Sequence, residues 1–248
     1  DSVSNLELLN IEELVVSFPS EITFISRMSL KKLDIKCDPA NSVDSIKFNN
    51  ALESLTMYGM VVYMEDLELP NLKYLSLTSC RLRRRTAPHT LKLTITQLKC
   101  ATMFVEPDII ADTLTKLSIT ICRIPPVAID RLPNTITDLK IIGCMEIDCN
   151  KLQLSNLTVL ELCGNHAFDV RLSDAGLRWI AKNKISDLTF KNVDITDDNI
   201  HHLADMPINY LTLIDCNFSI VGLNRLRGLP LRQLKVSGIP ARHLFIGL

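Results

Sequence analysis

Short apolar segments recur along this chain at nearly constant spacing. Each has the form apolar-x-x-Leu-x-apolar, and its fourth residue is Leu in all eleven copies, from Leu14 to Leu234. The copies start near residues 11, 30, 52, 72, 95, 114, 136, 157, 185, 208 and 231, so neighbouring starts are 19 to 28 residues apart. A period of this length predicts a repeat architecture for the whole chain.

The alternation within each copy predicts a short β-strand. Positions four and six point to one side of a strand, and positions three, five and seven point to the other. One such strand cannot bury its apolar row alone, whereas eleven strands stacked in parallel bury a continuous column of Leu and Ile side chains. We therefore expect a solenoid with about eleven parallel strands.

The segments that return from one strand to the next divide into two kinds. The last three open with Ser173, Thr196 and Ser219, which are suited to cap helices, and they continue with apolar residues at helical spacing. Asp174, Asp197 and Asp198 suit the first turns of two of these helices. The earlier returns contain prolines, including Pro70, Pro125 and Pro126, and predict extended chain or single 3₁₀ turns.

The eighth and ninth positions of each copy mark the turn after the strand. Half of the eight glycines stand at position eight, namely Gly59, Gly143, Gly164 and Gly238. Position nine is Cys80, Cys122, Cys144, Cys216 or Asn165 in five copies, and Pro19, Asp38, Met60, Met103, Val193 or Ile239 in the others. Because this polar column is incomplete, we expect an irregular solenoid.

This unit resembles the leucine-rich-repeat superfamily, whose pattern is L-x-x-L-x-L-x-x-N/C-x-L. The resemblance covers residues 11–239 and implies that residues 1–248 form a single α/β leucine-rich-repeat domain, a horseshoe with its strands on the concave face. Cysteine at position nine is similar to the intracellular cysteine-containing type known from F-box substrate receptors. No F-box is present in this sequence, so that likeness is an analogy.

Composition excludes several functions. The net charge is −1, from 27 basic and 28 acidic residues, which gives no overall field for nucleic acid or an anionic membrane. No apolar run approaches the roughly 20 residues needed to span a bilayer. Phosphate-binding loops rich in glycine are absent from the sequence. We expect no catalytic, cofactor-binding or metal site, no cofactor and no small-molecule substrate.

Four local motifs invite other interpretations. Cys144, Cys149, Cys163 and His166 have a spacing like that of zinc ligands, but the repeat places Cys144 and Cys163 in or beside its core, so we favour a ladder of buried thiols over zinc or disulfides. The run Arg81–Arg85 follows a strand and is interpreted as a solvated rim loop.

Of His201 and His202, one is expected in solvent and the other against the core. The acceptor sequons at Asn156 and Asn217 matter only if the protein is secreted.

The candidate functional surface is the concave face formed by positions three, five and seven. It is rich in Ser, Thr, Lys and Tyr, which suits a protein or peptide with acidic patches. The residues chosen for partner binding are Lys32, Lys36, Tyr58, Tyr74, Lys99, Lys116 and Tyr210.

The function expected is therefore that of a non-catalytic protein-interaction module in the cytoplasm or nucleus, such as a substrate-recognition or regulatory subunit. The alternatives are an extracellular receptor or adhesion ectodomain, and the recognition domain of a larger enzyme. The first repeat lies close to Asp1 and the chain ends on the apolar segment 244–248, so we also expect a neighbouring domain or subunit.

Overall fold

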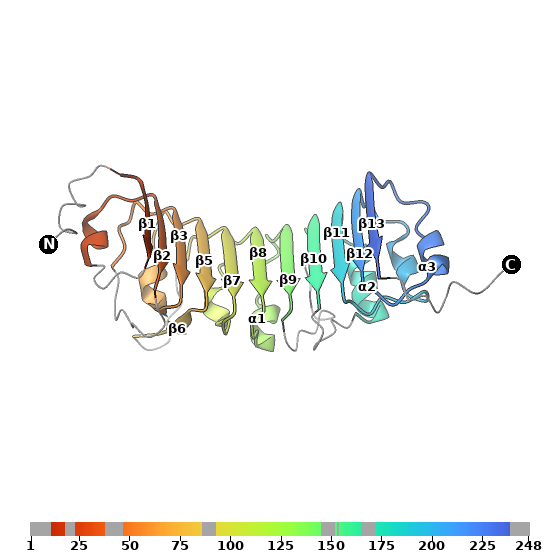
Figure 1. Ribbon diagram of the computed structural model, residues 1–248, viewed down its shortest axis with the longest axis horizontal. Coiled ribbons are helices and arrows are strands. Elements are labelled where there is room, and N and C mark those ends of the chain that lie inside the picture. The colour runs from red at the N-terminus through yellow and green to blue at the C-terminus, as the bar shows by residue number, and fades with distance from the viewer. Residues whose placement is uncertain are drawn as a thin grey trace.

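The computed structural model describes residues 11–17, 23–37, 47–85, 93–144, 152, 154–164 and 172–238. Eleven parallel strands form one sheet in the order β1-β2-β3-β5-β7-β8-β9-β10-β11-β12-β13, and β4 and β6 form a second, two-stranded sheet. Figure 1 shows the strands of the large sheet in a row that follows the order of the chain. The predicted leucine-rich-repeat solenoid is therefore confirmed as the fold.

The strands of the large sheet are all five residues long. They are β1 (Glu13–Ser17), β2 (Lys32–Lys36), β3 (Ser54–Tyr58), β5 (Tyr74–Thr78), β7 (Gln97–Ala101), β8 (Lys116–Thr120), β9 (Asp138–Ile142), β10 (Val159–Cys163), β11 (Asp187–Lys191), β12 (Tyr210–Ile214) and β13 (Gln233–Ser237). The small sheet consists of β4 (Val61–Tyr63) and β6 (Arg81–Arg83). The helices are η2 (Thr23–Arg27), η3 (Met64–Leu67), η4 (Pro107–Ile109), α1 (Pro126–Asp130), α2 (Asp174–Ala181), η6 (Ile200–Leu203) and α3 (Ile220–Asn224).

Every strand of the large sheet covers positions three to seven of one predicted copy. The fourth-position leucines pair in register through the whole sheet, from Leu14 with Leu33 to Leu211 with Leu234. Positions four and six are buried from β2 to β12, but Leu14 is only half-buried and Leu234 is 44% exposed. The core is thus a column whose two end layers are less covered than its middle.

Hydroxyl and amide side chains reinforce the edge of the sheet where the strands begin. The carbonyl at position two accepts two backbone N–H groups from the next repeat, as Thr115 does from Thr137 and Asp138. In the middle repeats it also accepts a hydroxyl, such as that of Thr137, at 3.2 Å. The same contact recurs along the sheet at Thr96, Thr115, Thr158 and Ser186. These hydroxyls therefore add a further donor to carbonyls that already accept two backbone N–H groups.

The turn after each strand has a repeated backbone conformation. Position eight lies in the left-handed region, with positive φ, in eight copies: Gly59, Ser79, Thr102, Ile121, Gly143, Asn192, Asp215 and Gly238. Its N–H group donates to the next strand's last carbonyl, as Gly143 does to Cys163 at 2.7 Å. The turn therefore extends the sheet's hydrogen bonding by one rung, and glycine suits this position because it lacks the steric cost of a side chain.

The ninth-position cysteines complete this turn. The Cys80 thiol lies 3.4 Å from the Thr78 carbonyl and 3.5 Å from the Met57 carbonyl of the preceding repeat. Cys144 and Cys216 make the same pair of contacts. All seven cysteines in the described part of the chain are buried and unbridged, which confirms the predicted ladder of buried thiols there.

The return segments agree with the prediction in part. Ser173 caps α2 and Ser219 caps α3, as expected. The return that opens at Thr196 forms the short 3₁₀ helix η6 instead, because Asn199 accepts from the Thr196 N–H and Asp197 is used by the next repeat. The return at Pro125 and Pro126, expected to be extended or 3₁₀, is the one-turn helix α1. Proline is tolerated there because the first residue of a helix needs no N–H partner.

Candidate functional site

The candidate site is the side of the large sheet that carries positions three, five and seven, called the open face below. In the parallel register, these positions form three columns of aligned side chains across all eleven strands. The middle column, for example, runs Ser76, Lys99, Ser118, Lys140 and Glu161 from β5 to β10. Most side chains on this face are exposed or half-buried, whereas those of positions four and six fill the core.

All seven residues predicted to bind a partner lie on this face. Three of them, Tyr74, Lys99 and Lys116, line one hollow. Lys36 and Tyr58 are register partners on β2 and β3, and Lys32 lies four residues earlier, at the start of β2. Tyr210 stands apart on β12. The assignment of these residues to binding remains a prediction, because their position alone does not identify a ligand.

The hollow lies over β7, β8 and β9 and has a volume of about 200 Å³. Its polar lining comprises Tyr74, Gln97, Lys99, Lys116, Ser118, Asp138 and Lys140. The Lys99 ammonium lies 5.9 Å from the centre of the Tyr74 ring, within the range of a cation–π contact. Lys140 forms an ion pair of 3.3 Å with Glu161 on the neighbouring strand. With Glu161 counted, three lysines stand against two carboxylates, so the hollow and its ion pair have a net charge of +1.

Lys140, Gln97 and Ser118 were expected on this face but were not chosen as binding residues. The sequence placed each on its strand, but a period of one repeat does not show which side chains enclose a depression. The enclosure depends on side-chain size in four neighbouring repeats at once, from β5 to β9.

Ile121 is a feature of this region that sequence reasoning missed. It follows β8 at position eight, where its φ is 51°, and 60% of its surface is exposed. For a residue with a branched β-carbon, this left-handed conformation costs about 1–2 kcal/mol. Its N–H donates to the Ile142 carbonyl at 2.7 Å, so it adjoins the end of β9. The available signal was an apolar residue at a position that eight of the other ten copies fill with Gly or a polar side chain, the exceptions being Phe18 and Cys37.

The run Arg81–Arg85 is not the solvated rim loop that was expected. Arg81–Arg83 form β6, and Arg85 donates to both carboxylate oxygens of Asp66, at 2.5 and 2.9 Å. The Arg85 guanidinium also lies 4.0 Å from the centre of the Tyr63 ring, and Arg84 pairs with Asp108. These contacts join neighbouring return segments, so Arg84 and Arg85 help to hold neighbouring repeats together.

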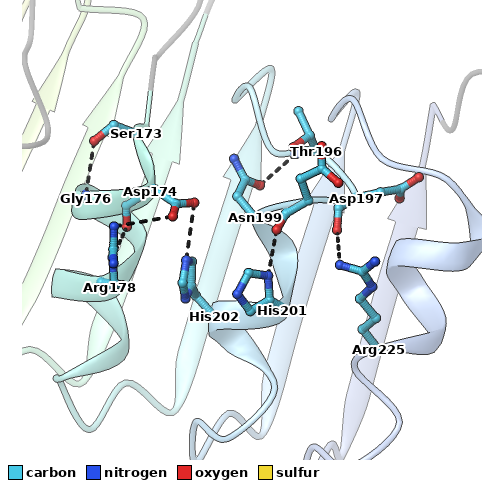
Figure 2. Close-up of polar contacts among 11 residues, drawn as sticks. Ser173, Asp174, Gly176, Arg178, Thr196, Asp197, Asn199, His201, His202 and Arg225 are labelled. Carbon is cyan, nitrogen blue, oxygen red and sulfur yellow. Dashed lines mark hydrogen bonds and ion pairs between the residues drawn. The ribbon is translucent and has the colours of Figure 1, made fainter.

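Asp174 and Asp197 organise the polar contacts of the helical returns (Figure 2). His202 Nε2 lies 3.3 Å from Asp174, and the His202 side chain is 15% exposed. The His201 ring is exposed and contacts the Asp198 carbonyl at 2.6 Å. One histidine is therefore in solvent and the other is largely covered, as predicted. Asp197 accepts hydrogen bonds from Ser219 N, Ser219 Oγ and Gly222 N.

The cysteine and histidine spacing that resembles a zinc site lies partly outside the described residues, which do not include Cys149 and His166. Cys144 and Cys163 are both buried, and burial raises the pKa of each thiol to about 11. Within the described ranges, no group of three or more His, Cys, Asp or Glu side chains could hold a metal ion.

Comparison with known proteins adds little to this geometry. No family model and no curated protein matches the sequence. A solved internalin (inlF) from Listeria monocytogenes str. 4b F2365 is 17% identical in sequence and superposes with a TM-score of 0.46. The match covers 95% of this chain and 84% of the internalin chain. Similarity at this level does not indicate what the chain binds. None of the helices in the described residues is long and apolar enough to cross a membrane.

Proposed function

We propose that this chain is a non-catalytic protein-interaction module that binds a protein or peptide segment on its open face. The observation that carries the proposal is the exact register of the eleven strands, which aligns exposed Lys and Tyr side chains from separate repeats on one surface. Tyr58 and Tyr210 are 44% and 43% exposed. Tyrosine contributes a large contact area and a hydroxyl group with little loss of side-chain entropy, so it is frequent at binding hot spots.

We further propose an intracellular location, in the cytoplasm or nucleus. Seven buried, unbridged cysteines support it, because thiols placed by repeat register persist in a reducing compartment. The fold is equally compatible with an extracellular receptor. The sequons favour that alternative weakly, since Asn156 already donates its side-chain amide to the Asn134 carbonyl at 2.7 Å. A role as the recognition subunit of a larger complex rests on the ninth-position cysteines alone.

The four tyrosines allow a direct test of the binding face. Tyr58, Tyr74 and Tyr210 lie on the open face, whereas Tyr63 lies in β4 of the small sheet. Replacing Tyr58 or Tyr63 in turn with a photoreactive phenylalanine derivative keeps an aromatic ring at each site. We expect the Tyr58 probe to crosslink a cellular protein and the Tyr63 probe not to do so. Crosslinks from Tyr63 alone would refute the proposed face.

Substitution supplies the matching loss-of-function test. Tyr58→Ala with Tyr74→Ala should abolish capture of the crosslinked protein while leaving the unfolding curve close to that of the wild type, because both side chains are at least partly exposed. Unchanged capture by this double variant would contradict the assignment of these two tyrosines.

A further inference from the structure

The three lysines of the hollow have few charge partners within the protein. Lys140 pairs with Glu161, and Lys99 lies over the Tyr74 ring. Among the described residues, no carboxylate lies within ion-pair distance of Lys116, although Asp138 lines the same hollow. Three ammonium groups on adjacent strands repel one another, and an anionic ligand would relieve that repulsion.

The spacing of these lysines suits an extended chain. Lys99, Lys116 and Lys140 stand on β7, β8 and β9, and neighbouring strands are about 4.8 Å apart. Lys99 and Lys140 therefore have backbones about 10 Å apart, which matches acidic residues three positions apart in a polyproline II segment, where such residues lie on the same side about 9 Å apart. Gln97 and Ser118 add hydrogen-bonding groups between them.

An apolar feature lies past the hollow, where β8 and β9 end. Ile121 is 60% exposed at position eight, in the left-handed conformation that eight copies share at this turn. In the next repeat the corresponding residue is Gly143, which has no side chain to cover Ile121. Ile142, half-buried at the end of β9, adjoins it through the hydrogen bond between the two backbones. Ile142 lies on the open face two residues after Lys140, so apolar surface follows the charged lining at this end of β9.

We propose that β7, β8, β9 and the turn at Ile121 bind an extended partner segment that carries acidic residues next to an apolar one. Its carboxylate or phosphate groups contact Lys99, Lys116 and Lys140, and its apolar side chain contacts Ile121 and Ile142. The inference rests on the proposed function, because it specifies the chemistry of a partner on the open face. It assigns the binding to three repeats out of eleven.

A synthetic peptide tests the inference without knowledge of the natural partner. The probe is a fluorescent peptide of about eight residues, Gly-Glu-Glu-Leu-Glu-Glu-Leu-Gly, long enough in extended form to cross three strands. Three relatives serve as further probes, with phosphoserine for Glu, with Ser for Leu, and with Lys for Glu. We expect saturable binding of the acidic peptides only, and the tighter of the Glu and phosphoserine forms identifies the anionic group.

Matched variants locate the binding. Lys99→Gln with Lys116→Gln should weaken binding about tenfold, whereas Lys191→Gln with Lys235→Gln, an exposed pair on β11 and β13 of the same face, should change it less than about twofold. Ile121→Asn should weaken binding of the Leu peptide but not of the Ser peptide. The same variant should raise the Tm, because asparagine tolerates a positive φ better than isoleucine does.

The results separate this inference from the proposed function. Equal losses for the two lysine pairs, or no saturable binding by folded wild-type protein, would overturn the inference. The Tyr58 and Tyr63 crosslinks judge the open face independently of these peptides. Crosslinking from Tyr58 together with failure of the peptides would therefore retain the face and reject the acidic segment.

Discussion

At the scale of single residues, the side chains that hold repeats together are short polar groups next to backbone. Asp197 is the clearest case, since its carboxylate accepts three hydrogen bonds from the start of the next return segment. The sequence indicated that Asp197 suits the first turn of its own helix. It did not indicate that the Asp197 carboxylate would bind the next return segment. A carboxylate after a strand can serve its own helix or the neighbouring repeat, and local spacing does not distinguish the two.

Removing the Asp197 carboxylate should destabilise the protein. Asp197→Ala leaves the Ser219 and Gly222 N–H groups without their acceptor, which should lower the free energy of unfolding by about 2–3 kcal/mol. Gly222→Ala should also be destabilising, because an added β-carbon would lie 2.3 Å from the same carboxylate oxygen. Urea unfolding measures both, with the exposed Asp205→Ala as control. A similar loss for Asp205→Ala would contradict this role.

At the scale of elements, the strands could be predicted and the returns only in part. All eleven strands lie where the Leu spacing placed them, because burial of positions four and six in every repeat leaves a single register. The returns lack such a constraint. Thr196 and Pro126 were each assigned the wrong local structure, since a few hydrogen bonds decide between a 3₁₀ turn and one turn of α-helix. The hollow over β7–β9 was beyond prediction because it depends on side chains from four repeats, including Tyr74 of β5.

The cysteine column makes a prediction about pH. Burial raises the pKa of Cys144 and Cys216 to about 11, whereas a thiol in an unfolded chain titrates near about 8.5. Between these values the unfolded state loses the proton first, so stability is retained below about pH 8.5 and falls as the pH rises toward 11. The expected loss at pH 10 is about 2 kcal/mol per thiol.

A double variant isolates this effect from other groups that titrate at high pH. Cys144→Ser with Cys216→Ser keeps a hydrogen-bond donor at each site but removes the titration. Chemical denaturation at neutral pH and at pH 10 should show a smaller fall in stability for this variant than for the wild type. An equal fall would show that the two thiols do not contribute.

At the scale of the whole molecule, the solenoid has contacts mainly between neighbouring repeats, so stability should vary along its length. Leu117 is 1% exposed in the middle of the column, while Leu234 in β13 is 44% exposed. Leu117→Ala should therefore cost about 2–5 kcal/mol, and Leu234→Ala under about 1 kcal/mol. Urea unfolding of the two variants measures the difference. Equal costs would mean that the last strand is covered as fully as the middle.

The unbroken register of the strands has a consequence for how the open face can change. Repeat starts differ by 19 to 28 residues, yet every strand keeps the same five positions, so the returns absorb all the variation in length. The strand and the repeat position of a residue therefore fix where its side chain lies on the open face. A substitution at one position alters the contacts of that side chain and leaves the other side chains in place. Such a surface can be retuned to a new partner residue by residue, without redesign of the fold that supports it.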